Sequence, residues 1–211
     1  MFSIRPLIVF CSLVILPINP LNSIADEPAP DDVIPLVAPK GWGGETIHVP
    51  PAFAKDMKIK GVEKIRFAPG MFKPDAVDFF SYVLVFRLEA EPELTREVIE
   101  RELLAYYRGL ATAVGRGKIK TDGFSFSMKQ VEGITAEMNV SHYVAALQWI
   151  EPFATSKAQT LNFELRVWKA KKSNRNWIYM SVSPNKSDDP IWNIMYQVRD
   201  NFLEALDDDR Q

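Results

Sequence analysis

The sequence predicts an α+β fold in which an antiparallel β-sheet is packed by one long central helix and one C-terminal helix, forming an α/β sandwich. Apolar residues recur every three or four positions over residues 95–114 and again over residues 190–206, which is the period of an amphipathic helix. Between these segments, four β-like runs follow one another through short polar turns, and strands joined in this way pair antiparallel. The four runs are residues 124–129, 134–149, 160–168 and 177–182.

Three further strands are expected before the first helix. Residues 45–49 alternate polar and apolar side chains and end at a pair of prolines. Residues 62–68 end at a Pro-Gly dipeptide that suits a type II turn. Residues 79–88 are nearly all aromatic or aliphatic, which is typical of a central strand that is covered on both faces.

The ends of both helices carry capping signals. Thr95 is a suitable N-cap for the first helix, and Gly115 suits the C′ position that follows it. Asp189 is a suitable N-cap for the second helix, which then begins with a proline. The predicted buried stripe of the first helix is Ile99, Leu103, Tyr106 or Tyr107, Leu110 and Val114. That of the second helix is Ile191, Met195, Val198, Phe202 and Leu206.

Residues 1–25 have the three parts of a secretory signal peptide. Arg5 supplies the positive start, residues 7–18 form an apolar run, and a small-x-small motif ends at Ala25. We therefore expect the protein to be exported, to the periplasm or beyond the cell, with cleavage after Ala25. Retention of the leader as a membrane tether is the alternative, and a membrane is an expected partner only in that case.

The rest of the chain divides into a linker, one domain and a tail. Residues 26–40 hold four prolines and read as an extended, solvated linker. Residues 41–206 are expected to form a single globular α+β domain, because 47% of the chain is hydrophobic and it contains five Trp and thirteen Phe. Residues 207–211 are an acidic tail.

The only cysteine, Cys11, lies in the leader, so the mature domain is expected to be free of cysteine. Without thiolates, and with only two histidines, the usual zinc ligand sets cannot be assembled, and we expect neither a metal nor a cofactor. Loss of the leader's single charge leaves 24 of the 25 basic residues beside 27 acidic ones, a net charge of −3. This balance gives no electrostatic case for binding nucleic acid.

Three residues are candidates for acid–base chemistry. Glu151 lies between aromatic residues at a strand end broken by proline, which makes it the first carboxyl to inspect. His48 is expected on a strand surface or rim, and His142 follows Ser141 on a strand, where neighbouring side chains point to opposite faces and cannot form a dyad. No nucleophile elbow, phosphate loop or dinucleotide fingerprint is present.

The most distinctive local sequence is residues 66–75. It places two large apolar residues, Met71 and Phe72, in an expected turn. Such residues either tuck against the core or present an apolar patch to a partner. Together with Trp42 and Tyr82 they form the predicted binding surface.

The order of the predicted elements resembles the Mog1/PsbP-like α/β sandwich, especially its exported bacterial members. The resemblance covers residues 42–206, because the strand over residues 42–49 with its two following prolines is similar to the opening of such domains and the helix over residues 191–206 to their closing helix. The segment over residues 67–72, Phe-Ala-Pro-Gly-Met-Phe, also resembles a signature of uncharacterised secreted bacterial proteins. Neither likeness implies an activity or a functional residue.

We therefore expect an exported, non-enzymatic binding or accessory domain for a protein or a small molecule. The alternative is an extracytoplasmic hydrolase whose carboxylate or His-carboxylate site is not visible in sequence order. A deep pocket that joins Glu151, His48 or His142 to a second acid would favour the hydrolase. An apolar patch around Met71 and Phe72 would favour the binding domain.

Overall fold

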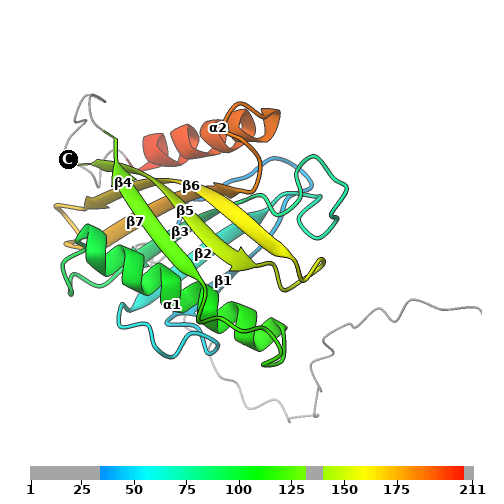
Figure 1. Ribbon diagram of the computed structural model, residues 1–211. Coiled ribbons are helices and arrows are strands. Elements are labelled where there is room, and N and C mark those ends of the chain that lie inside the picture. Colours follow the sequence, from blue (N-terminus) through cyan, green and yellow to red (C-terminus); the bar gives the residue numbers. More distant parts are fainter. Residues whose placement is uncertain (1–33, 132–139, 207–211) are drawn as a thin grey trace, which may run out of the picture. The chain divides into compact units, whose positions relative to one another are not determined.

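The computed structural model describes residues 34–131 and 140–206, and within them one seven-stranded antiparallel sheet carries a helix on each face (Figure 1). The strands are β1 (Gly43–Val49), β2 (Gly61–Phe67), β3 (Tyr82–Leu88), β4 (Ser125–Gln130), β5 (Ser141–Ile150), β6 (Ala158–Lys169) and β7 (Asn176–Ser183), and the helices are α1 (Arg96–Val114) and α2 (Pro190–Ala205). Their order across the sheet is β1-β2-β3-β7-β6-β5-β4. The predicted α+β fold is confirmed.

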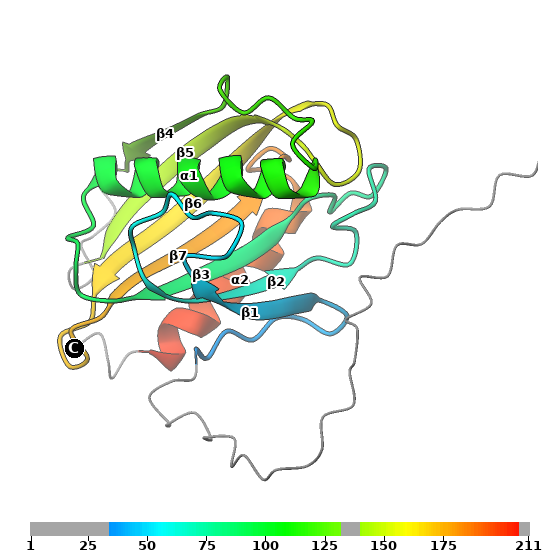
Figure 2. The ribbon, with the colours of Figure 1, turned by 90° about the horizontal axis from the view of Figure 1, so that it is seen from below.

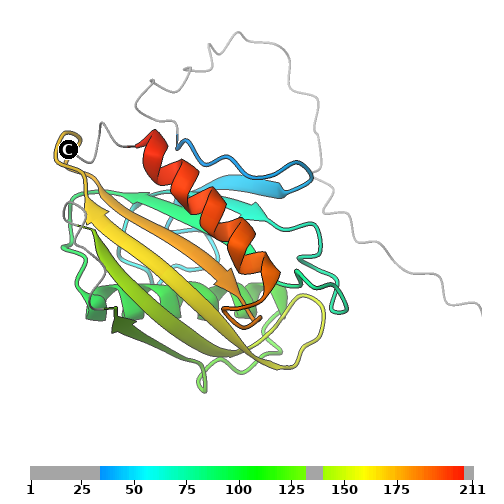
Figure 3. The same ribbon diagram turned by 90° about the horizontal axis from the view of Figure 1, so that it is seen from above.

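The central strands β3 and β7 are buried on both faces. Val83 and Val85 of β3 contribute to the core beneath α2, whereas Leu84 and Phe86 contribute to the core beneath α1. Strand β7 is buried along its whole length. Figures 2 and 3 show the two helices on opposite sides of the sheet, so the domain has one hydrophobic core on each face.

Strand β3 begins later than the predicted strand over residues 79–88. Phe80 has φ 50°, outside the extended region, and its N–H donates to the carbonyl of Met71 at 3.1 Å. The chain becomes extended only at Tyr82. Of the predicted run over residues 134–149, the part up to residue 139 lies outside the described residues.

The N-terminus of α1 is capped as predicted, because Thr95 Oγ1 accepts the N–H of Val98 at 3.3 Å. Its C-terminus differs from the prediction. Gly115 has φ −74°, and the left-handed conformation falls further on, at positions that include Gly117 with φ 73°. Close packing explains glycine at position 115, because a Cβ there would lie 2.8 Å from the carbonyl oxygen of Ala111 and 2.8 Å from the side chain of Ile119.

The buried face of α1 matches most of the predicted stripe and adds an acid to it. Leu110 and Val114 are only partly buried, whereas Glu102 is fully buried. The carboxylate of Glu102 accepts the backbone N–H of Lys58 at 2.6 Å and that of Ile59 at 3.3 Å. Glu102 therefore attaches the loop over residues 50–60 to the helix (Figure 2).

Helix α2 has the predicted buried stripe but not the predicted cap bond. All five stripe residues are buried, and Trp192 is buried beside them. The carboxylate of Asp189 accepts the N–H of Lys186 at 2.9 Å, upstream of the helix, and makes no cap bond to the helix itself. Within the described residues, no helix is both long and apolar enough to cross a membrane.

Part of the segment that we expected to be a solvated linker belongs to the domain. Ile34 and Leu36 are 3% and 1% exposed and pack into the core beneath α2. The carbonyl of Ile34 also accepts a hydrogen bond from Lys64 Nζ at 2.6 Å. Apolar side chains between prolines gain more from this cover than from solvent, so the domain includes residue 34, and residues 26–33 lie outside the described residues.

Replacing Glu102 with Ala should destabilise the domain by about 2 kcal/mol or more, because it leaves two backbone N–H groups of the 50–60 loop without their acceptor. Urea unfolding measures the loss. The exposed Glu204→Ala on α2 is the matched control and should change stability by less than about 0.5 kcal/mol. Equal losses in the two variants would contradict the structural role of Glu102.

Candidate functional site

A cavity of about 270 Å³ lies on the α1 face of the sheet, and we call it the aromatic pocket. Its aromatic walls are Phe53, Phe67, Phe72, Phe80, Tyr82, Tyr106 and Phe153, and its other lining residues are Glu45, Ile65, Met71 and Leu110. They come from β1, β2, β3, α1 and three connecting segments. Three of the four predicted binding residues, Met71, Phe72 and Tyr82, therefore lie together.

Five of the aromatic rings form a closed circuit. Each ring centroid lies 5.5–6.5 Å from the next, a favourable spacing for aromatic pairs. In order around the circuit the rings are Phe67, Phe72, Phe153, Phe80 and Tyr82. The interplanar angles of 42–80° show that the rings are tilted against one another and do not form a parallel stack.

The loop between β2 and β3 separates Met71 from Phe72. Met71 is 5% exposed and packs in the core, whereas Phe72 is 53% exposed. The loop is closed by Asp78, whose carboxylate accepts the N–H of Gly70 at 2.9 Å. The position favours glycine, because a Cβ on Gly70 would lie 1.9 Å from that carboxylate and 2.6 Å from the Cβ of Ala76. The sequence allowed these two residues either to pack in the core or to be exposed as an apolar patch. Met71 packs in the core, and Phe72 is exposed.

Glu151 closes the turn that carries Phe153. Its carboxylate is fully buried and accepts the N–H groups of Phe153, Ala154 and Thr155, as well as the hydroxyl of Thr155 at 2.8 Å. It does not line the aromatic pocket. The hydrogen bonds of Glu151 hold this turn in place, and Phe153 of the same turn is one of the five rings of the circuit. In the structure, Glu151 therefore positions Phe153.

The two histidines lie away from the aromatic pocket. His48 is exposed on the edge strand β1, as predicted, and it pairs in register with Val62. His142 lies on β5 and pairs in register with Arg166 of β6. Neither His48, His142 nor Glu151 lines the pocket, so the structure does not bring the three acid–base candidates together there.

The sequence reading missed a buried acid, Glu63 on β2. Glu63 is 1% exposed, the hydroxyl of Tyr106 donates to its Oε1 at 2.9 Å, and its Oε2 has no hydrogen-bond partner. Burial raises the pKa of Glu63 to about 8, and repulsion from Glu45 adds to the effect, while the bond from Tyr106 opposes it. The alternation of β2 could have revealed this, because Glu63 is in phase with Ile65 and Phe67, which face α1.

Two more tyrosine hydroxyls lie in the interior beside the pocket. The hydroxyl oxygens of Tyr82 and Tyr107 are 2.5 Å apart and share a hydrogen bond. Burial raises the pKa of both tyrosines above the ordinary value, as it does for Tyr106. The hydroxyls are therefore neutral near pH 7, and Tyr82 presents its ring to the pocket while its hydroxyl bonds to Tyr107 on α1.

The far wall of the pocket depends on a close contact between α1 and the loop over residues 50–60. A Cβ on Gly109 of α1 would lie 2.2 Å from the carbonyl oxygen of Phe53, so the helix packs directly on the main chain of the loop. The rings of Phe53 and Tyr106 meet edge to face at 5.1 Å. Only glycine at position 109 permits this approach.

Trp42 is separated from the other three predicted binding residues. It is half-buried and lines a second cavity, of about 610 Å³, beside the start of α2. Pro69, Ile191 and Ile194 lie in the same lining. The predicted surface therefore divides between two cavities.

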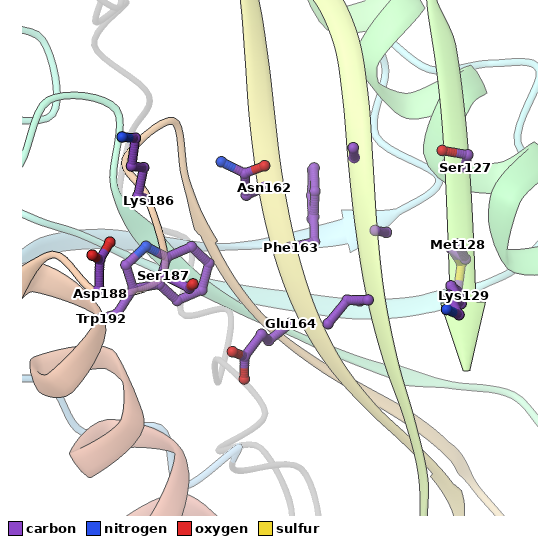
Figure 4. Close-up of a pocket in the computed structure, with 13 residues that line it drawn as sticks. Ser127, Met128, Lys129, Asn162, Phe163, Glu164, Lys186, Ser187, Asp188 and Trp192 are labelled. Carbon is purple, nitrogen blue, oxygen red and sulfur yellow. The ribbon is translucent and has the colours of Figure 1, made fainter. Parts of the chain in front are cut away.

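A third cavity, a groove of about 850 Å³, runs between β4–β6 and the segment that leads into α2 (Figure 4). Charges of both signs line it, among them Lys129, Glu164, Lys186 and Asp188. Several of its polar groups already have protein partners. Asn162 Nδ2 and Trp192 Nε1 each donate to the carbonyl of Asn185 at 3.2 Å, and Tyr196 donates its hydroxyl to Glu164. The side chains that line the groove therefore do not indicate one chemical class of ligand.

Within residues 34–131 and 140–206, no three His, Cys, Asp or Glu side chains are placed to hold a metal ion together. Comparison with known proteins assigns no family: no family model, no curated protein and no solved structure matches the chain. The α+β sandwich is established by the structure of this chain itself. Membership of the Mog1/PsbP-like group stays a prediction.

Glu63 should make the domain less stable as the pH rises. Between about pH 4.5 and 8 the folded chain holds a proton on this carboxyl that the unfolded chain has lost, so stability falls by up to about 1.4 kcal/mol per pH unit. Glu63→Gln removes that slope and should gain stability relative to the wild type as the pH increases through this window. Urea unfolding at pH 5, 6.5 and 8 measures the difference.

The control for this series is the exposed Glu204→Gln, whose pH profile should run parallel to that of the wild type. A parallel profile for Glu63→Gln as well would show that the buried carboxyl does not hold its proton in the folded state.

Proposed function

We propose that this protein is an exported, non-enzymatic domain that binds a small ligand in the aromatic pocket. The observation that carries the proposal is the closed circuit of five aromatic rings. Small-molecule sites are lined mainly by hydrophobic and aromatic side chains, and a few polar groups orient the ligand. Glu45 is the polar group that would orient a ligand, because its exposed side chain lines the same cavity.

The size of the pocket favours a small ligand or the end group of a larger one. Its volume of about 270 Å³ is slightly below the range of about 300–1,000 Å³ that is usual for pockets of drug-sized molecules. Phe72 and Phe153 are 53% and 39% exposed and their ring centroids lie 5.5 Å apart, so this pair of contacting rings forms the solvent-facing rim of the pocket. Together they form a small exposed apolar patch at the mouth of the pocket.

Binding has better support than hydrolysis. The carboxylate of Glu151 is occupied by the N–H groups of its own turn, which leaves it poorly placed to exchange a proton with a substrate. His48 and His142 do not line the aromatic pocket, and Glu63 lies buried behind Tyr106. The described residues thus offer this cavity aromatic surface without an acid–base pair.

The export part of the proposal rests on the sequence of residues 1–25 alone. Its positive start, apolar run and small-x-small motif together are the pattern of a cleaved leader. A domain released in this way meets its ligand outside the cytoplasm.

Phe72→Ala should weaken ligand binding without unfolding the domain, because Phe72 is exposed and makes ring contacts with Phe67 and Phe153. The probe is toluene, and the reporter is the Met71 methyl signal in NMR spectra of protein with labelled methionine methyl groups. We expect saturable shifts in the wild type and an affinity about five- to tenfold lower in Phe72→Ala.

Val77→Ala is the matched control, since Val77 is 89% exposed on the same loop and does not line the aromatic pocket. It should bind toluene as the wild type does. Absence of a saturable Met71 shift in the wild type would argue against a ligand pocket here.

Mass spectrometry of the protein recovered from an exporting bacterial host should show a mature N-terminus at Asp26. Recovery of the intact chain in the membrane fraction would instead support the tether alternative.

A further inference from the structure

The charge of the aromatic pocket has one sign. Of the described residues that line it, Glu45 is the only charged one, and neither lysine nor arginine is among them. A second carboxyl, Glu63, lies behind the wall and bonds to the hydroxyl of Tyr106, but burial raises its pKa to about 8, so near pH 7 the charge of the pocket comes from Glu45 alone. An anionic ligand would meet no cation in this pocket and would face the carboxylate of Glu45.

The rings themselves favour positive charge. The face of an aromatic ring carries the negative part of its quadrupole, and a cation within about 6 Å of the ring centroid is attracted to it. All five rings of the circuit line the cavity, and neighbouring rings are tilted by 42–80° to one another. Tyr106 also lines the cavity, but its hydroxyl already donates to Glu63 and is not a free donor for a ligand.

A pocket with an apolar surface and a single carboxylate is suited to a cation whose charged nitrogen is surrounded by alkyl groups. A bare ammonium would lose its hydration in this pocket and gain few hydrogen bonds in return. A methylated ammonium is weakly hydrated and fills the space between aromatic walls, which is the known use of such cages. The volume of about 270 Å³ suits a group of that size.

We propose that the ligand of the aromatic pocket carries a quaternary or otherwise alkylated ammonium group, which the ring circuit encloses and the Glu45 carboxylate attracts. This inference rests on the proposed binding function and names its ligand class. Choline serves as the cationic probe, and 3,3-dimethyl-1-butanol, which replaces its nitrogen by carbon, serves as the neutral probe of the same shape.

The experiment titrates both probes into the full chain and follows the Met71 methyl signal, with calorimetry as a second measure. Choline should bind at least tenfold more tightly than the neutral alcohol. Glu45→Gln should weaken choline binding about three- to tenfold and leave binding of the alcohol unchanged. Because Glu45 is exposed, thermal unfolding should show that this variant is folded as the wild type is.

Glu204→Gln is the matched control, since it removes one exposed carboxylate from α2 on the opposite face of the sheet. It should leave choline binding unchanged, and equal weakening by both variants would overturn the role of Glu45. If the alcohol binds as tightly as choline, the ligand class is wrong while the binding pocket stands. If neither probe shifts the Met71 signal and toluene also fails, both the ligand class and the proposed function are wrong.

Discussion

An α-helix with its side chains is about 10–12 Å across, whereas neighbouring strands are about 4.8 Å apart, so one helix covers only two or three strands. A seven-stranded sheet with one helix on each face is therefore left partly uncovered on both sides. Helix α2 packs on β3 and β7 (Figure 3). The groove is lined by residues of β4–β6 and by Trp192 of α2. Helix α1 contacts β4, and loops, among them the loop over residues 50–60, pack beside α1 on the same face (Figure 2). The aromatic pocket forms where those loops meet the end of α1.

The elements could be predicted from the sequence because their signals are local. The spacing of apolar residues and the capping residues identify α1 and α2. The strands are identified by their runs of apolar and β-branched residues and by the turns that end them. The first strand residue of β3 was misplaced because the left-handed conformation of Phe80 is set by a hydrogen bond to Met71, nine residues earlier. The burial of Ile34 was missed because its cover comes from α2 at the other end of the chain.

The candidate site was partly predictable. Two apolar residues in a turn indicated Met71 and Phe72, yet the sequence could not show that Phe153, some eighty residues later, completes the ring circuit with Phe72. The aromatic neighbours of Glu151 make it a candidate in the sequence, and one of them, Phe153, lies in the turn whose N–H groups the carboxylate of Glu151 accepts. Glu63 was detectable from strand alternation, but its partner Tyr106 lies on α1, 43 residues away. Local sequence patterns carry no information about contacts between elements that are far apart in the chain.

The packing of Gly109 on the carbonyl of Phe53 brings two stretches of main chain together at one wall of the cavity. Side chains change rotamer readily, whereas a helix backbone and a carbonyl move only with the elements that carry them. The distance between the backbones of α1 and the Phe53 loop thus determines the width of the cavity at this wall. During divergence of this fold, a single added methyl group at position 109 would push the Phe53 loop outward and enlarge the space. The size of the cavity would then be set by a residue that does not line it.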